Sequence, residues 1–377
     1  MLTWVEIKRE AFKHNLAQFR KIVGPRVRLM AVVKSNAYGH GMIEVAKIAL
    51  KEGADWLGVI NLDEALELRQ AKIKVPIFIL SYWDISEIRE KFVQISDCDF
   101  PVYTLEQAKI LSKLAQKIKR KANIHIKIDT GASRIGVLPQ EAISFARKIL
   151  KLPGLNIRGI FTHYAASESK NQSYTNWQTE RFKKVLKDLE ASGTSIPLAH
   201  AGCSASTIAN PNTFFDMVRI GIGMYGLWPS GEIRELVRRR KIKINLKPAL
   251  SWKTKIIQVK NVAKNTFIGY DCTYRTKKKT KIAVLPIGYW DGYDRLLSNS
   301  GQVLVHGKHC PIRGRICMNL TMVDVSGLAN IKTGDEVVLV GSQGKERIRV
   351  EEIAHKTGTI NYEVVTRINP LIPRIYI

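Results

Sequence analysis

Short apolar runs rich in β-branched residues alternate with longer amphipathic stretches over the first two-thirds of the chain. In the longer stretches the apolar positions follow a helical period, which favours a strand followed by a helix, repeated eight times. This repeat predicts a (β/α)8, or TIM, barrel, with a doubly wound parallel sheet as the alternative. The predicted strands are Leu29–Val33, Trp56–Ile60, Ile77–Leu80, Phe100–Tyr103, Ile124–Ile128, Ile157–Thr162, Pro197–His200 and Met217–Ile220. The predicted helices include Ile43–Glu52, Leu62–Ala71 and Glu106–Ile118.

The pattern changes after about Leu236, where long helical stretches become scarce and turn residues separate short apolar runs. We therefore expect a barrel domain over residues 1–236 and a mostly antiparallel, β-rich domain over residues 237–377. The first few residues of the chain are candidates to pair with this second domain. The predicted strands of the second domain are Ser251–Val259, Thr280–Ile287, Gly301–Val305, Thr321–Val325 and Glu336–Val340.

The charge is strongly basic, with 60 Lys and Arg against 33 Asp and Glu. The basic runs Lys117–Lys121, Arg238–Lys243 and Lys277–Lys281 are scattered, and no aromatic-rich nucleic-acid motif accompanies them. We therefore expect a solvated, lysine-rich surface and no nucleic-acid partner. No apolar run approaches the length of a membrane span, and the five cysteines include no paired CxxC motif. These features predict a cytoplasmic protein without a membrane partner.

Candidate chemistry lies where the predicted barrel strands end, because barrel active sites form at the C-terminal ends of the strands. Lys34 follows the first strand directly, and a lysine there can condense with an aldehyde cofactor. Alternation along the fifth strand places Lys127 inward, where its amine requires a partner or a modification. His163 and Arg219 lie on later strands, so basic side chains converge on one rim.

The last strand end suggests a phosphate site. Residues 221–226 (GIGMYG) match the GxGxxG dinucleotide pattern, but the following Gly-Leu-Trp-Pro-Ser-Gly interrupts any helix, so we reject that interpretation. Barrels often bind phosphate with the loops after strands seven and eight. Ser204 with the backbone amides of Gly221 and Ile222 fits that pattern. A phosphate site combined with a lysine after the first strand suits a pyridoxal phosphate enzyme.

One cluster raises the question of a metal site. His306, His309 and Cys310 lie close together in the β-rich part, but no second paired motif completes a ligand set. Structural zinc sites usually have four well-spaced ligands. We therefore expect no metal.

The segment Val32–Gly41 (VVKSNAYGHG) resembles the pyridoxal-phosphate attachment signature of alanine racemases. The resemblance covers essentially the whole chain, in order. It implies a pyridoxal-phosphate-dependent isomerase that interconverts L- and D-alanine, supplies D-alanine for the peptidoglycan of the cell wall, and forms a homodimer with shared active sites. The further matching segments are Lys127–Arg134, His163, Ser204, Arg219–Gly226, Ile287–Gly292, Gly314–Met318 and Asn361–Glu363.

The resemblance also implies roles for individual residues. Lys34 would carry the cofactor as a Schiff base and act as one acid–base group, and Tyr270 of the partner subunit would be the other. Arg134 and the backbone amide of Met318 would contact the substrate carboxylate, and Lys127 matches a lysine that is carbamylated in several members. Arg219 would face the pyridine nitrogen with His163 behind it. The implied cofactor-binding residues are Lys34, Tyr38, Arg134, His163, Ser204, Arg219, Gly221, Ile222 and Tyr362.

The chain departs from the family pattern at two positions. Cys203 stands where asparagine is common, and Asn319 stands where aspartate is usual. Because of these two departures, a racemase that acts on serine or on several amino acids remains an alternative interpretation. A decarboxylase of the same fold and a pyridoxal-phosphate-binding barrel without activity are also compatible with the barrel pattern, although the β-rich third disfavours the latter. The positions that match the family's substrate corridor are Glu168, Arg295 and Arg315.

Overall fold

The computed structural model describes all 377 residues, which form two compact units. The barrel unit comprises Ala11–Ala37 and Met42–Pro248. The β-rich unit comprises Met1–Glu10, Tyr38–Gly41 and Ala249–Ile377. The chain thus passes into the β-rich unit for four residues soon after Lys34. None of the helices combines the length and apolar character that crossing a membrane requires.

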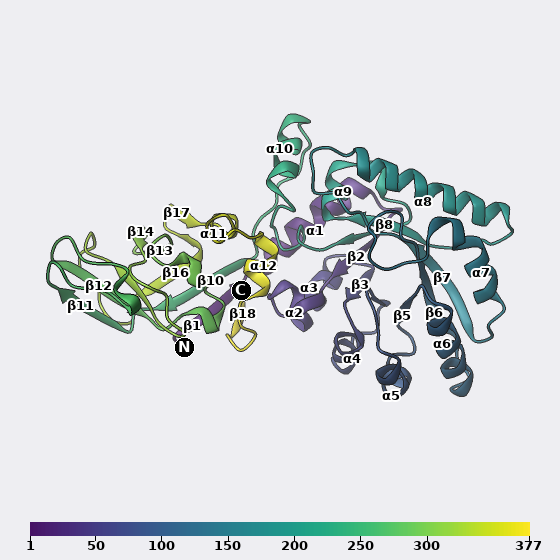
Figure 1. Cartoon of the computed structure of the whole chain (residues 1–377), viewed down its shortest axis with the longest axis horizontal. Helices are drawn as coiled ribbons and strands as arrows, with labels where there is room; N and C mark the ends of the chain where they lie inside the picture. The colour runs from purple at the N-terminus through teal and green to yellow at the C-terminus, as the bar shows by residue number, and fades with distance from the viewer. The chain divides into compact units, whose positions relative to one another are not determined.

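Eight parallel strands close into a barrel in chain order, which confirms the predicted (β/α)8 architecture (Figure 1). Their ends differ from the predicted ends by at most three residues. Seven of the eight strands are largely buried, as expected when helices cover a parallel sheet from outside, and β7 is buried over its last three residues. The strands are β2 (Arg28–Val32), β3 (Trp56–Val59), β4 (Ile77–Ile79), β5 (Asp99–Val102), β6 (Ala122–Lys127), β7 (Leu155–Phe161), β8 (Ala199–Cys203) and β9 (Met217–Ile220).

Local capping fixes where the outer helices begin. Asn61 accepts a hydrogen bond from the Glu64 N–H at the start of one helix, and Thr104 forms a capping box with Gln107 at the start of another. The three helices predicted from periodicity are confirmed. The helices of this part of the chain are α1 (Arg9–Val23), α2 (Lys34–Tyr38), α3 (Met42–Lys51), α4 (Leu62–Gln70), α5 (Ile85–Ile95), α6 (Leu105–Lys117), α7 (Ala142–Leu150), α8 (Ser173–Ala191), α9 (Ser204–Ala209) and α10 (Gly231–Arg239).

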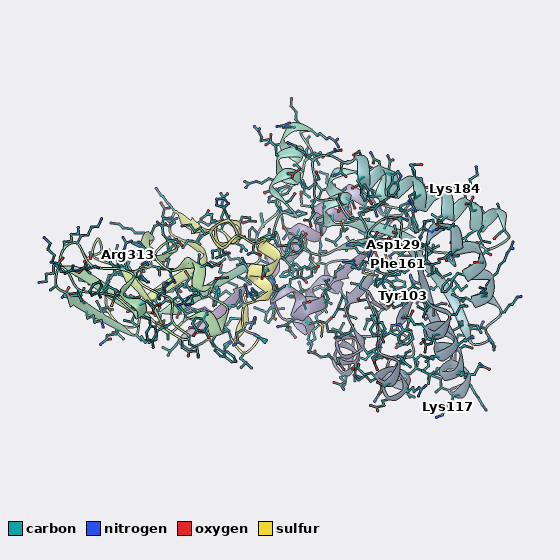
Figure 2. The ribbon with its side chains drawn as sticks, viewed as in Figure 1. Tyr103, Lys117, Asp129, Phe161, Lys184 and Arg313 are labelled. Atoms are coloured by element: carbon teal, nitrogen blue, oxygen red, sulfur yellow. The ribbon has the colours of Figure 1, made fainter.

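The barrel interior combines an apolar cluster with buried polar groups. Figure 2 shows Phe161 and Asp129 within the barrel region, whereas Lys117 and Lys184 lie at its outer surface. The interior therefore has the apolar walls that strengthen electrostatic interactions among the polar groups between them. The apolar cluster consists of Met30, Trp56, Phe78, Phe161, Leu198 and Met217.

The β-rich unit contains a seven-stranded sheet and a three-stranded sheet, and its pairing is antiparallel except between β1 and β18. The mostly antiparallel prediction is confirmed. The predicted segment Ser251–Val259 is two strands, because the chain changes sheet at Ile256 and Ile257. Three strands had not been predicted: β14, β17 and β18. The first few residues, which were expected to pair with this domain, form β1 beside β10 and β18. The elements are β1 (Thr3–Ile7), β10 (Leu250–Lys255), β11 (Gln258–Val262), β12 (Thr280–Leu285), β13 (Gln302–Val305), β14 (Lys308–Pro311), β15 (Thr321–Asp324), β16 (Glu336–Gln343), β17 (Glu346–Ile348), α11 (Val350–Thr357), α12 (Asn361–Thr366) and β18 (Arg374–Tyr376).

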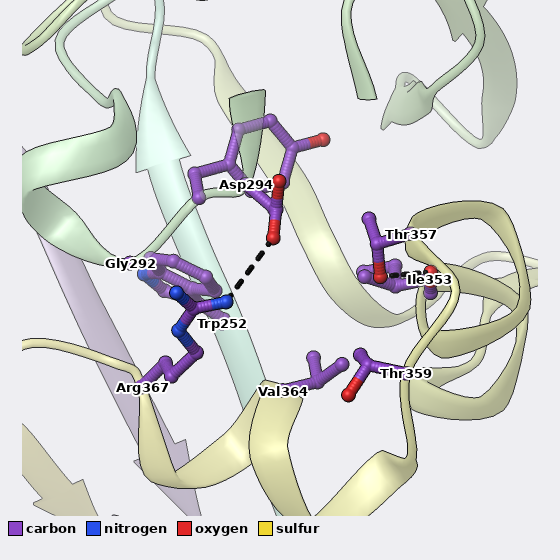
Figure 3. A pocket seen from close by; sticks show the side chains of 9 residues that line it. Trp252, Gly292, Asp294, Ile353, Thr357, Thr359, Val364 and Arg367 are labelled. Atoms are coloured by element: carbon purple, nitrogen blue, oxygen red, sulfur yellow. Dashed lines mark hydrogen bonds and ion pairs between the residues drawn. The ribbon is translucent and has the colours of Figure 1, made fainter. Parts of the chain in front are cut away.

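A small cavity lies within the β-rich unit between the 292–294 turn and α11 and α12 (Figure 3). The Asp294–Arg367 ion pair, at 3.4 Å, lies at its wall, and Trp252 and Tyr293 line its interior. The cavity volume is about 10 Å³, which is space for about one water molecule. Its walls are formed by packed side chains of this unit, so it is a packing feature of the unit.

Candidate active site

The backbone after Lys34 is strained. Lys34 follows β2 at the C-terminal end of the barrel, and the next three residues have left-handed φ values of 55°, 52° and 51°. Each such non-glycine residue costs about 1–2 kcal/mol. Two side chains hold the turn: Glu64 Oε1 accepts from the Ser35 N–H at 2.6 Å, and Asn36 Oδ1 accepts from the Met42 N–H at 2.9 Å. Strain of this kind is concentrated at functional sites, so the turn marks the position of Lys34 as special.

The surroundings of Lys34 favour its neutral amine. Burial lowers the pKa of the Lys34 amine, and the positive charge of Arg134 lowers it further, while Glu64 acts in the opposite direction. A lysine with a lowered pKa is a better nucleophile and a better base near neutral pH than an exposed lysine. The location of Lys34 at the barrel mouth therefore comes with the electrostatics that amine chemistry requires.

Lys127 points into the barrel, as its position in the strand predicted. It ends β6 with 4% of its surface exposed, and its Nζ lies 5.2 Å from the centre of the Phe161 ring. The amine makes neither a hydrogen bond nor an ion pair. Burial, followed by the charges of Arg134 and Arg219, lowers the pKa of Lys127 to about 7. A large fraction of this amine is therefore neutral at neutral pH.

Arg219 is buried, and only its two terminal nitrogens, Nη1 and Nη2, are hydrogen-bonded within the protein. Its Nη1 donates to His200 Nδ1 at 2.8 Å, and its Nη2 donates to the carbonyls of Thr162 and Ala201 at 2.8 Å each. Nη2 also lies 3.3 Å from His163 Nδ1. Burial and the charge of Arg219 hold the pKa of His163 well below its usual range, so this ring is neutral. The Nε of Arg219 has no hydrogen-bond acceptor in the protein and remains available to a ligand.

The loop that carries Arg134 is organised by one carboxylate. Asp129 follows β6 and accepts hydrogen bonds from four successive backbone N–H groups, of residues 131 to 134, at 2.8–3.1 Å. Partial burial raises the pKa of Asp129, but these N–H groups lower it by more. The loop lies over a cavity of about 10 Å³. The residues that line this cavity are Lys127, Ile128, Asp129, Ala132, Arg134, Ile135, Thr162 and His163.

Ser204 gathers two backbone amides at the last strand. Its Oγ accepts from the Gly221 N–H at 3.0 Å and from the Gly223 N–H at 3.2 Å. A Cβ on Gly223 would lie 2.4 Å from the Phe19 ring, so only glycine fits at this close approach. The segment continues as turns, and the next helix begins at Gly231, which leaves the GxGxxG pattern without the helix of a dinucleotide site.

The remaining residues of the predicted site lie in the β-rich unit. The rings of Tyr38 and Tyr362 lie 6.1 Å apart. Tyr270 is 68% exposed, and the turn after it is held by Asp271, whose carboxylate lies 3.3 Å from Arg315. Met318 is also exposed, and its backbone N–H donates to no acceptor within the chain. The structure thus gathers the predicted lysines, arginines, His163 and Ser204 in one unit and the three tyrosines with Met318 in the other.

Two buried polar residues behind Arg219 were missed from the sequence, His125 and Asp99, and His200, which ends the seventh predicted strand, was given no role. A signal was present, because His125 lies two residues before Lys127 and therefore faces the barrel interior. Two members of the histidine and cysteine cluster that raised the question of a metal have carboxylate neighbours. The Nε2 atoms of His306 and His309 each lie 3.1 Å from a carboxylate of the unit, and no group of three potential metal ligands occurs in the structure.

Comparison with known families matches both parts of the chain. The family described as "Alanine racemase, N-terminal domain" matches residues 7–229, and "Alanine racemase, C-terminal domain" matches residues 249–376. The chain belongs to the alanine racemase family. Membership explains why a lysine at the barrel mouth occurs together with a β-rich second unit.

Similar proteins extend over the whole length. An alanine racemase of Methanococcus maripaludis is 46% identical over 99% of this chain and 98% of its own. An alanine racemase structure from Bacillus anthracis with bound L-Ala-P is 38% identical, covers 100% of this chain and 95% of its own, and superposes with a TM-score of 0.92. One from Bartonella henselae, with covalently bound pyridoxal phosphate, is 27% identical, covers 100% of both chains and has a TM-score of 0.86.

Proposed function

We propose that this chain is an alanine racemase that interconverts L- and D-alanine with pyridoxal phosphate as its cofactor. The observation that carries the proposal is the position of Lys34 in a strained turn at the barrel mouth, with a lowered amine pKa. Family membership over both units supplies the reaction class. The same activity would supply D-alanine for the cell wall.

The residues present fit pyridoxal phosphate. Lys34, Lys127, Arg134 and Arg219 influence one another's charge, while only Glu64 and Asp129 contribute acids to the same environment. This surplus of positive charge suits an anionic ligand. The acceptor-free Nε of Arg219 suits a ring nitrogen. Ser204 Oγ accepts from the Gly221 and Gly223 N–H groups, so its own hydroxyl proton is available to a phosphate oxygen.

We assign the cofactor contacts accordingly. Lys34 would provide the covalent attachment, Arg219 would donate to the ring nitrogen, and Arg134 would contact the phenolic oxygen. When bound, the cofactor would withdraw electrons from the substrate's Cα and so acidify its proton. Arg219 would keep its own proton throughout, because a guanidinium remains charged at neutral pH. The proposed phosphate contacts are Tyr38, Ser204, Gly221, Ile222 and Tyr362.

Racemisation requires a proton to leave one face of Cα and another to arrive on the opposite face. We assign these transfers to Lys34 Nζ and to the hydroxyl of Tyr270, with their roles exchanged when the direction of reaction reverses. The Arg134 guanidinium and the acceptor-free N–H of Met318 would hold the substrate carboxylate. Lys127, as a carbamate, would supply an anion beside Arg134.

We propose that Tyr270 acts in the active site of a partner subunit, so that the enzyme is a homodimer. Seven large apolar side chains are exposed between residues 267 and 320, the part of the chain that contains Tyr270, and such side chains are candidates for an interface where they adjoin one another. Backbone hydrogen bonds join the 289–290 turn to Cys317 and Met318, so part of this set is contiguous. Its members are Phe267, Tyr270, Tyr289, Trp290, Leu296, Met318 and Leu320.

A direct assay tests the proposed reaction. Purified protein with pyridoxal phosphate is incubated with L-alanine, and D-alanine is detected with a D-amino-acid oxidase, alongside L-serine and L-lysine. We expect D-alanine to dominate and to disappear in Lys34→Ala, while Lys51→Ala, a change at an exposed helical lysine, leaves activity intact. Faster turnover of L-serine than of L-alanine would identify serine as the preferred substrate. Cys203 and Asn319 leave that outcome open. No turnover of any amino acid would refute the proposal.

A reducing, cytoplasmic location accompanies this proposal. All five cysteines are free, although two of them are buried and three are not. Free thiols persist where glutathione and thioredoxin keep them reduced.

A further inference from the structure

A chain of hydrogen bonds extends behind Arg219 through the interior of the barrel. Arg219 Nη1 lies 2.8 Å from His200 Nδ1, and His200 Nε2 lies 2.9 Å from His125 Nδ1. His125 Nε2 lies 3.2 Å from Asp99 Oδ1, and the other oxygen of Asp99 lies 3.2 Å from Arg158 Nη1. The proposed reaction uses Arg219 alone among these residues.

The barrel is built to accommodate this chain. Asp99, His125 and His200 are completely buried and come from β5, β6 and β8. The pairing register shifts beside each histidine, and a Cβ on Gly159 would lie 2.3 Å from His125 Nδ1. Asp99 begins its strand, whereas Arg219 lies near the C-terminal end of β9. The chain therefore connects the far end of the barrel to the end that carries the active site.

The donors and acceptors of this chain can be ordered in one way only. A guanidinium has no acceptor, so His200 Nδ1 must accept from Arg219 and the His200 proton must lie on Nε2. That proton is donated to His125 Nδ1, so the His125 proton lies on its own Nε2. This proton is donated to Asp99, a carboxylate that also accepts from Arg158. Every link is satisfied, and all the donors point towards Asp99.

The opposite order fails at Arg219. If His125 carried a proton on Nδ1, it would donate to His200 Nε2, and the His200 proton would move to Nδ1. Two donors would then face each other at the 2.8 Å contact with Arg219. Burial and the charge of Arg219 also hold the pKa of His200 well below its usual range, so a second proton on this ring is excluded.

We propose that Asp99, acting through His125 and His200, is a positioning residue that holds the Arg219 guanidinium in place for the cofactor ring. The proposal rests on the role that the proposed function gives to Arg219. Hydrogen bonds in series polarise one another in a low-dielectric interior, so the anion at one end strengthens the bond at the other. Loss of the Asp99 acceptor should therefore loosen Arg219 without removing any group that would contact the cofactor.

The first test reads the histidine protons directly. Full-length protein with bound cofactor is labelled with ¹⁵N-histidine, and long-range ¹H–¹⁵N spectra assign the protonated nitrogen of each ring. We expect His125 and His200 to carry their protons on Nε2 in the wild type. In Asp99→Leu, the His200 Nε2–H signal should weaken or exchange faster with water, and in Asp99→Asn, which retains an oxygen acceptor but not the negative charge, it should recover in part. A proton on Nδ1 of either ring, or an unchanged His200 signal in Asp99→Leu, would overturn the proposal.

The second test separates the proposed relay from a general loss of structure. In the wild-type background, Asp99→Leu should lower kcat about tenfold, as expected for weakening one hydrogen bond to a charged group. In a His200→Phe background the same change should have little further effect, because the relay is already cut. Asp97→Leu, a change at the neighbouring exposed carboxylate, is the matched control. Equal losses in both backgrounds would refute the relay.

A second variant is informative if Asp99→Leu does not fold. His125→Phe cuts the chain but retains the Asp99–Arg158 ion pair, and an aromatic ring suits the contacts with Trp56 and Phe78. It should reproduce the same loss in kcat and the same change at His200, and unchanged values of both would overturn the proposal. Protein that gives the expected spectra but does not racemise alanine would refute the proposed function and leave the relay standing.

Discussion

Removal of carbon dioxide should deprive the enzyme of an anion at Lys127. The Lys127 amine is buried, makes no hydrogen bond, and has positive charges from Arg134 and Arg219 as neighbours. An ammonium group in that place is unfavourable. A neutral amine can attack the carbon of carbon dioxide, forming an N–C bond, releasing a proton and leaving a carbamate anion. Carbamate formation would place a negative charge at Lys127, next to the positive charges of Arg134 and Arg219.

The size of the effect follows from the pKa of about 7 for Lys127. At pH 7 about half of these amines would be neutral, against about one in 3,000 for a lysine with a pKa near 10.5. The reactive fraction is therefore about 1,500-fold larger than at an ordinary lysine. Because the neutral form appears as pH rises through about 7, carbamate should increase between about pH 6 and pH 8 at constant dissolved carbon dioxide and should be lost below that range.

The assay is ¹³C NMR of the protein under ¹³C-labelled carbon dioxide, combined with racemase activity in degassed and equilibrated buffers. We expect one protein-bound carbamate resonance at pH 8 that disappears in Lys127→Met. The signal should persist in Lys121→Ala, a change at an exposed lysine immediately before the same strand. Activity should fall on degassing and return with bicarbonate. No carbamate signal at pH 8, or one that survives in Lys127→Met, would refute the reasoning.

Three further changes test other parts of the site. Ser35→Gly should raise the free energy of unfolding, measured by urea titration, by up to about 1 kcal/mol, because glycine adopts a left-handed φ without steric cost. A loss of stability would show that the backbone at Ser35 is not strained. Gly159→Ala should cost about 1–3 kcal/mol in the same titration by crowding His125, and a neutral result would show that the barrel can relax there. A mixture of inactive Lys34→Ala and inactive Tyr270→Phe should recover part of the activity after subunit exchange, and no recovery would refute the shared site.

Much of the fold could be predicted from the sequence because its elements repeat a local pattern. The barrel strands are buried on both faces and read as continuous apolar runs, so their positions follow from hydrophobicity alone. The strands that were missed are different. β14, β17 and β18 are only three or four residues long. Their existence depends on a partner strand that a local pattern cannot reveal.

The candidate site was predictable where its residues occupy strand ends. Lys34, Lys127 and Arg219 could be placed from strand position alone, since parallel strands bring their carboxyl ends to one rim. The left-handed turn after Lys34 could not be predicted, because left-handed backbone is expected at glycine and the residues of this turn are not glycines. The hydrogen bond between His125 and His200 could not be predicted either, because it joins side chains 75 positions apart in the sequence.

The features that lower the stability of the barrel unit are concentrated around Lys34. A left-handed turn of non-glycine residues, a buried lysine without a partner and a surplus of cations each lower the stability of the fold, and all three lie at the same end of the barrel. None of them improves packing, so a sequence selected for stability alone would remove them. An anionic ligand bound at Lys34 would offset the surplus of positive charge and would stabilise the folded chain by binding to it. The local instability is therefore evidence for the site that is independent of any motif, and it locates the site at the same residues.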